Sequence, residues 1–178
     1  SEIDEVVERI KRTLEEAEKR VKKASEDHKR RLDELRKKVE KLIEDNERTL
    51  EAVARRKIDE ELLKELEKES EDRLRKLKRD AEEVTREMKK TSDELAEELK
   101  RLKDEIRKEL ERLEREGIEE RLLRKLRKVV KDVDDRLKEL LEENRDVVRR
   151  IKEELEKLLE KVRRSIEESR RRMRETRR

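Results

Sequence analysis

The apolar residues of this chain recur every 18 residues, and this period limits the structures that the chain can form. The pattern is clearest in the last third. There, Val129, Val130, Val133, Leu137, Leu140 and Leu141 are followed 18 positions later by Val147, Val148, Ile151, Leu155, Leu158 and Leu159. Eighteen residues make five turns of about 3.6 residues each, which is the period of a straight α-helix. A strict seven-residue repeat would instead impose a left-handed supercoil. The spacing therefore predicts untwisted helices that pack along one apolar stripe.

Composition removes the main competing fold classes. Charged residues make up 62% of the 178 residues, and there is no Pro, no Cys, no aromatic residue, one Gly and one His. Disordered chains can be equally charged, but they are rich in Pro, Gly and Ser and have no helical period. Strands would need alternating β-branched or aromatic runs, which the sequence lacks. The absence of Cys excludes disulfides and thiol chemistry. We therefore expect an all-α protein rich in long helices.

Two short segments carry the signals of helix ends. Asp59 suits the N-cap of a helix, and Ile58 before it can form a hydrophobic staple. Gly117 suits the left-handed position after a helix end, and Ile118 repeats the staple. These turns predict helices at about 2–56, 59–116 and 119–177 within a single domain, 1–178. The expected architecture is a long, straight, up-down-up three-helix bundle.

Thr91 and Ser92 offer an alternative division of the chain. Thr91 and Glu94 fit a capping box, so a turn or hinge at 90–92 would give four helices. The apolar period argues against a turn there, because Leu74, Ser92 and Leu110 share one phase of the 18-residue repeat. We therefore expect one continuous helix over 59–116.

Several polar residues occupy positions in the apolar stripes. If the helices pair antiparallel about the two turns, residue i of the first helix faces about 115 − i in the second. Residue j of the second helix then faces about 235 − j in the third. This pairing gathers the polar residues into two layers, one of Ser25, His28, Ser92 and Asn144, and one of Asn46, Ser70, Ser165 and Ser169. Buried polar groups need hydrogen-bond partners, and such layers can fix helix register. We predict a structural role for both.

A functional role for His28 finds little support in the sequence. Metal sites in helical bundles use carboxylates and a Glu-x-x-His motif, whereas Ala24 and Ser25 precede His28 at the matching positions. There is no second His, and no carboxylate lies in the apolar stripe. A thin three-helix core also has no pocket for a nucleophile and its base. We therefore expect no enzyme, no catalytic, cofactor-binding or metal-binding residue, and no cofactor.

The charge pattern describes solvated helix faces. Lys and Arg number 57 and Asp and Glu number 54, and opposite signs alternate at helical spacing, as in Glu16–Arg20. The basic run 163–178 is interpreted as cations at a helix C-terminus, so nucleic-acid binding is not expected. No apolar stretch is long enough to span a membrane. No partner is required, with homo-oligomerisation as the alternative. The chain begins at Ser1, as a tag-cleaved product would. We expect a soluble protein made in the cytoplasm of a recombinant host, with no natural location.

Together these features resemble those of de novo designed helical bundles with buried hydrogen-bond networks. The shared features are the 18-residue repeat in all three helices, near-equal helix lengths, Glu-, Lys- and Arg-filled surfaces, absent aromatics and polar core layers. The resemblance covers the whole chain, but it is one of design style and supplies no functional residues. It implies a designed scaffold without natural function, whose polar layers specify helix register and pairing. A designed homo-oligomer, a hinge-switching bundle and a natural coiled-coil or spectrin-like spacer or interaction module stay open.

Overall fold

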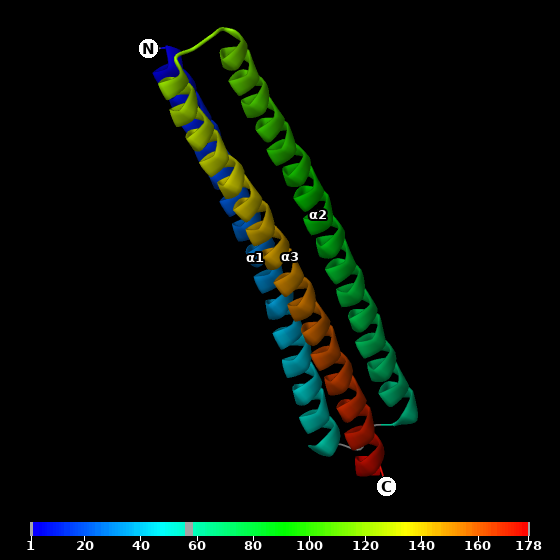
Figure 1. Cartoon of the computed structure of the whole chain (residues 1–178). Helices are drawn as coiled ribbons and strands as arrows, with labels where there is room; N and C mark the ends of the chain where they lie inside the picture. The colour runs from blue at the N-terminus through cyan, green and yellow to red at the C-terminus, as the bar shows by residue number, and fades with distance from the viewer. Residues whose placement is uncertain (1, 56–58, 178) are drawn as a thin grey trace. The chain divides into compact units, whose positions relative to one another are not determined.

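The chain forms three long helices. The computed structural model describes residues 2–55 and 59–177. The helices are α1 (Glu2–Arg55), α2 (Glu60–Arg115) and α3 (Glu120–Arg177), each drawn as an uninterrupted ribbon in Figure 1. No strand occurs in the described residues. The protein is therefore all-α, with the three-helix architecture that the apolar period predicts. The limits of α2 and α3 lie within one residue of the expected ones, while residue 56 lies outside the described residues.

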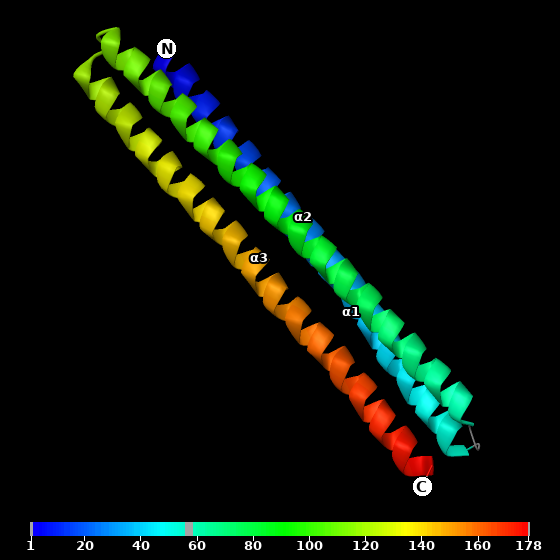
Figure 2. The same cartoon turned by 90° about the vertical axis from the view of Figure 1, so that its right-hand side faces the viewer.

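Helix α2 passes through Thr91 and Ser92 without a break (Figure 2). The alternative with a turn at 90–92 and four helices is therefore wrong. The local capping signal yields to the apolar stripe: Met88 and Leu95, on either side of Ser92, are both buried. A chain reversal at Ser92 would remove one of these side chains from its place in the core. Burial of a large apolar side chain outweighs a capping box by about 1–2 kcal/mol.

The start of α2 is capped by Asp59. The Leu62 N–H donates to the Asp59 carboxylate at 2.9 Å, and the Leu63 N–H donates to the Asp59 carbonyl at 3.1 Å. The bond to the carboxylate satisfies one of the N–H groups that the first turn of a helix leaves without an intrahelical partner, and the bond to the carbonyl is the first of the helix itself. Acidic Glu60 and Glu61 fill the first turn, where the helix dipole favours negative charge. Ile58, the expected staple residue, lies outside the described residues.

The end of α2 is set by Gly117, whose φ of +75° lies in the left-handed region. Its N–H donates to the Glu114 carbonyl at 3.3 Å, which satisfies a carbonyl of the last turn. Ile118 follows, half-buried against the core. The Leu122 and Leu123 N–H groups then donate to the Glu119 carbonyl, both at 3.0 Å, and α3 begins.

The contacts divide the chain into two compact units, each with a segment of all three helices. Unit 1 comprises Ser1–Asp27 and Met88–Arg149, and unit 2 comprises His28–Glu87 and Arg150–Arg178. Each unit has its own apolar core. In unit 1 it is one cluster, running from Val6 to Ala24 in α1, from Leu95 to Leu113 in α2 and from Leu126 to Leu140 in α3. In unit 2, one cluster consists of Val39, Leu42, Leu77, Val162 and Ile166, and another of Val53, Leu63 and Met173.

Candidate functional site

The most deeply buried polar contact of unit 1 joins Asn144 of α3 to Ser92 of α2. Asn144 is 0% exposed, and its Nδ2 donates a hydrogen bond to the Ser92 Oγ at 2.9 Å. The pairing lies within one residue of the expected register. The Oδ1 of Asn144 is also buried, and it has no hydrogen-bond partner in the described part of the chain. The site therefore satisfies the amide only in part.

The other two residues expected in this layer are Ser25 and His28 of α1. Ser25 of α1 is half-buried, and among residues 2–55 and 59–177 no hydrogen bond links its hydroxyl to Ser92 or Asn144. His28 is buried, at 6% exposure, but it belongs to unit 2. Of the four residues expected in this layer, the structure joins two by a hydrogen bond.

A second contact in unit 2 joins Asn46 of α1 to Ser70 of α2. The Ser70 hydroxyl donates to the Asn46 Oδ1 at 3.4 Å, a long and therefore weak hydrogen bond. Asn46 is buried, and its Nδ2 has no hydrogen-bond partner among the described residues. This pairing also lies within one residue of the expected register. Both asparagines thus use one side of the amide across helices and leave the other side unsatisfied.

Ser165 and Ser169 of α3 were expected in the same layer as Asn46 and Ser70. Ser169 is buried, but its hydroxyl donates to the Ser165 carbonyl of its own helix at 2.8 Å. Ser165 itself is half-buried. A serine side chain is short, and the carbonyl one turn back is its most accessible acceptor inside a helix. The hydrogen bonds of this layer therefore link α1 to α2, while α3 satisfies Ser169 internally.

Ion pairs between helices are a feature that sequence reasoning missed. Arg20, expected to pair with Glu16 within α1, contacts Glu98 of α2 instead. The α1–α2 pairs are Arg9–Glu109, Arg20–Glu98, Arg31–Glu87, Lys38–Asp80, Arg73–Asp45 and Arg112–Glu2. The α1–α3 pairs are Arg36–Glu154 and Arg136–Glu18, and the α2–α3 pairs are Arg107–Asp134, Arg127–Glu114 and Arg170–Glu71. The sequence does contain a signal for these pairs. Residues of opposite charge lie beside the apolar stripes, at positions that face one another when two helices are aligned antiparallel.

Two arginines that form ion pairs, Arg112 and Arg136, show the effect of these contacts on pKa. Arg112 donates to Glu109 at 2.8 Å, and this hydrogen bond lowers the pKa of Glu109 and raises the pKa of Arg112. Arg136 donates to Glu18 and Glu143, each at 3.1 Å, and these bonds raise the pKa of Arg136. A general acid or base needs a pKa moved toward the working pH. These shifts run in the opposite direction, so the pairs suit structural contacts.

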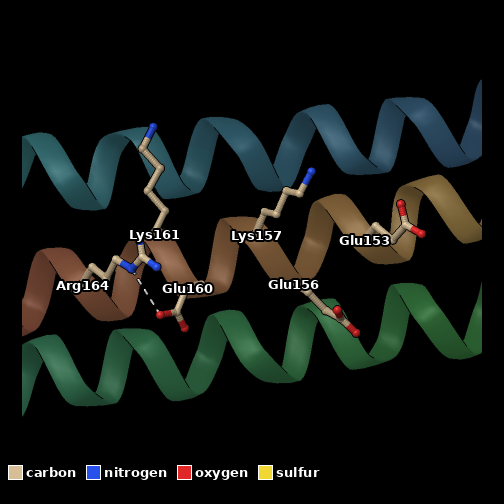
Figure 3. Close-up of a pocket in the computed structure, with 6 residues that line it drawn as sticks. All are labelled: Glu153, Glu156, Lys157, Glu160, Lys161 and Arg164. Atoms are coloured by element: carbon tan, nitrogen blue, oxygen red, sulfur yellow. Dashed lines mark hydrogen bonds and ion pairs between the residues drawn. The ribbon is translucent and has the colours of Figure 1, made fainter.

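A hollow on the surface of unit 2 is lined by one helix alone. Its lining consists of Glu153, Glu156, Lys157, Glu160, Lys161 and Arg164, all from α3, and Figure 3 shows these side chains fanning outward from a single ribbon. Glu160 accepts hydrogen bonds from Arg163 at 2.7 Å and from Arg164 at 3.3 Å. The bond from Arg163 is the main cause that lowers the pKa of Glu160.

No group of three or more His, Asp or Glu side chains in residues 2–55 and 59–177 is placed to hold a metal ion. Over the same ranges, no helix has the length and apolar character needed to cross a membrane.

Comparison with known proteins gave one structural likeness of interest. No protein-family model matches the sequence, and no curated protein matches it. A solved structure described as a computationally designed three helix bundle is 24% identical, and the match covers 98% of this chain and 80% of that chain, with a TM-score of 0.38. The assignment of the fold stands on the helices and cores described above.

Proposed function

We propose that this chain is a de novo designed structural scaffold with no natural biochemical function, whose buried polar contacts specify helix register and pairing. The observation that carries the proposal is the hydrogen bond from the fully buried Asn144 to the half-buried Ser92. Burying an amide costs free energy unless it is hydrogen-bonded, and an apolar side chain would fill the same space without that cost. A polar pair at such a position is therefore best explained by the specificity that it adds.

The 18-residue period explains why specificity is needed. If α2 and α3 slipped past one another by 18 residues, the apolar columns would still match. Asn144 would then face Leu74 or Leu110 in place of Ser92. A buried amide that loses its partner costs about 1–3 kcal/mol. The slipped arrangement carries this cost in addition to the unsatisfied Oδ1 of Asn144 that the native arrangement already has. The contact between Asn46 and Ser70 adds the same discrimination between α1 and α2.

The same geometry supports a chain that works without substrate, cofactor or required partner. One surface hollow of unit 2 is lined by α3 alone and holds ion-paired charges, and another is lined by residues of α1 and α3. The groups with shifted pKa values are carboxylates and guanidinium groups held in their charged forms. Neither supplies a nucleophile with a base beside it, which is what most catalytic sites require.

A double-mutant cycle on Ser92 and Asn144 tests the energetic basis of this proposal. Ser92→Ala leaves the buried Nδ2 of Asn144 without an acceptor, and we expect a loss of about 1–3 kcal/mol in the free energy of unfolding. Adding Asn144→Leu removes the unpaired amide, and the double variant should be at least as stable as the parent chain. Denaturant unfolding of the four proteins gives the coupling energy. Additive effects of the two substitutions would contradict a role for this hydrogen bond.

A further inference from the structure

Four of the ion pairs between α1 and α2 form a regular row. The cations are Arg9, Arg20, Arg31 and Lys38 of α1, and their partners are Glu109, Glu98, Glu87 and Asp80 of α2. The positions advance by 11, 11 and 7 residues in α1 and retreat by the same steps in α2. The first two pairs lie in unit 1 and the last two in unit 2. We call the α1 residues the basic row and the α2 residues the acidic row.

The spacing keeps each row on one edge of its apolar stripe. Eleven residues are close to three turns of a helix and seven are close to two, so each step returns to the same side. The other edge of α1 has a different character. There Glu18 meets Arg136 of α3, and Arg36 meets Glu154 of α3, so the signs alternate along the helix. The edge that faces α2 carries the four cations in succession, flanked by Glu2 and Asp45, which pair with Arg112 and Arg73 of α2. The two edges of α1 therefore differ in their pattern of charge.

The apolar core alone does not decide the order in which the three helices are arranged around it, and this difference in charge can. Three helices can surround a common core in two orders, which differ in the edge of α1 that α2 packs against. An apolar stripe whose two edges are alike is compatible with both helix orders. A symmetric bundle therefore needs a further feature to exclude the wrong helix order. In the wrong order the basic row would face α3, and the acidic row would no longer meet it.

We propose that the basic and acidic rows decide which edge of α1 packs against α2. This role is separate from the buried polar contacts and goes beyond them. A single exposed ion pair contributes little. Four pairs of the same polarity act together, because the wrong order removes all four attractions at once. Lys38 and Asp80 lie 3.2 Å apart and Arg9 and Glu109 lie 3.9 Å apart, which places both pairs within ion-pair distance.

Three variants of the full chain test this proposal. The first reverses the basic row by Arg9→Glu, Arg20→Glu, Arg31→Glu and Lys38→Glu. The second is a charge-matched control with Arg12→Glu, Lys19→Glu, Lys37→Glu and Arg48→Glu, four exposed positions of α1 that form no ion pair in the described part. Each set of four reversals changes the net charge by −8, from +3 to −5. The third combines the reversed basic row with Glu109→Arg, Glu98→Arg, Glu87→Arg and Asp80→Lys, which restores the charge to +3.

Helix order is read by a cross-link that each variant carries. Thr13→Cys and Glu105→Cys lie one turn along from Arg9 and one turn back from Glu109, on the same line as the rows. The parent chain has no Cys, so a disulfide between the two new residues reports that α2 lies against the basic edge of α1. The cross-linked parent, without row changes, gives the reference yield.

We expect the row-reversed variant to lose most of its cross-link and to melt about 5–15 °C below the charge-matched control. The variant with both rows exchanged should recover the cross-link and the melting temperature. An unchanged cross-link yield in the row-reversed variant would overturn the proposal, whatever its melting temperature. Failure of the exchanged variant to recover would overturn it too. None of these variants changes Asn46, Ser70, Ser92 or Asn144. The result is therefore independent of the proposed role of the buried polar contacts.

Discussion

At the scale of single residues, the buried asparagines define the character of this core. An amide side chain offers two donor hydrogens and two acceptor lone pairs. Asn144 uses its donor side and Asn46 its acceptor side, and in each the remaining polar atom is buried without a hydrogen bond in the described chain. Each residue therefore leaves a buried polar atom unsatisfied, which lowers the stability of the fold.

The positions of these residues could be predicted from sequence, but their bonds could not. The register of Ser92 with Asn144, and of Asn46 with Ser70, follows from turn positions and helix rise to within one residue. The bond from Ser169 to its own helix depends on a side-chain rotamer, which a periodic pattern does not encode. The grouping of His28 with Ser25 stays a prediction, because the two residues belong to different units.

Glu109 provides a test of the ion pairs by pH. Its pKa is lowered from the ordinary 4.5, chiefly by the hydrogen bond from Arg112. The carboxylate therefore stabilises the fold above pH 4.5, and this contribution is lost as the pH falls through the lower folded-state value. We expect Glu109→Gln to lose less stability than the parent between neutral and strongly acidic pH, as measured by urea unfolding. Glu111→Gln, an exposed neighbour in no ion pair within the described residues, should behave like the parent.

At the scale of elements, helix ends are decided locally and helix continuity by the core. Asp59 begins α2 and Gly117 ends it, each through local backbone conformation or hydrogen bonds, and both positions could be predicted from the sequence. Thr91 carries a similar local signal, yet α2 continues because its apolar stripe does. The ion pairs between helices were missed because an arginine side chain reaches equally far along its own helix and across to the next. Arg20 shows this by contacting Glu98.

Gly117 tests the left-handed end of α2. Apart from Gly117 and its two chain neighbours, no heavy atom of the described residues lies within 4 Å of where a β-carbon would stand, so substitution meets no steric clash there. The cost of Gly117→Ala should therefore come from the backbone alone, and we expect a loss of about 1–2 kcal/mol in the free energy of unfolding. Gly117→Asn should cost less, since asparagine tolerates this conformation better. Equal stability of the alanine variant and the parent, measured by denaturant unfolding, would show that φ is not constrained there.

At the scale of the whole molecule, most large apolar side chains of the described residues are buried or half-buried. Leu62, at 44% exposure, is the single large hydrophobic side chain that stands exposed among the described residues. The half-buried apolar residues of α3, including Val129 and Leu141, pack against the core of unit 1. Stable association between protein chains usually needs a sizeable apolar patch, and these observations leave little for one.

We therefore expect a monomer. Light scattering after size-exclusion chromatography should give a mass of 22.0 kDa across a wide range of protein concentrations. A mass two or three times larger would place part of the α3 stripe in an interface between copies. Repeating the measurement in high salt serves as the control, because screening weakens contacts between surface charges and leaves apolar ones intact.

We propose above that buried polar contacts select one helix arrangement from several that the apolar repeat allows. The direct test is a variant with Asn46→Leu, Ser70→Ala, Ser92→Ala and Asn144→Leu, compared with the parent by amide NMR spectroscopy and light scattering. We predict an equal or higher melting temperature together with more than one set of amide signals or more than one mass, because slipped registers are no longer penalised. A single set of native-like signals at 22.0 kDa would contradict the claim and leave these residues without a role in specificity.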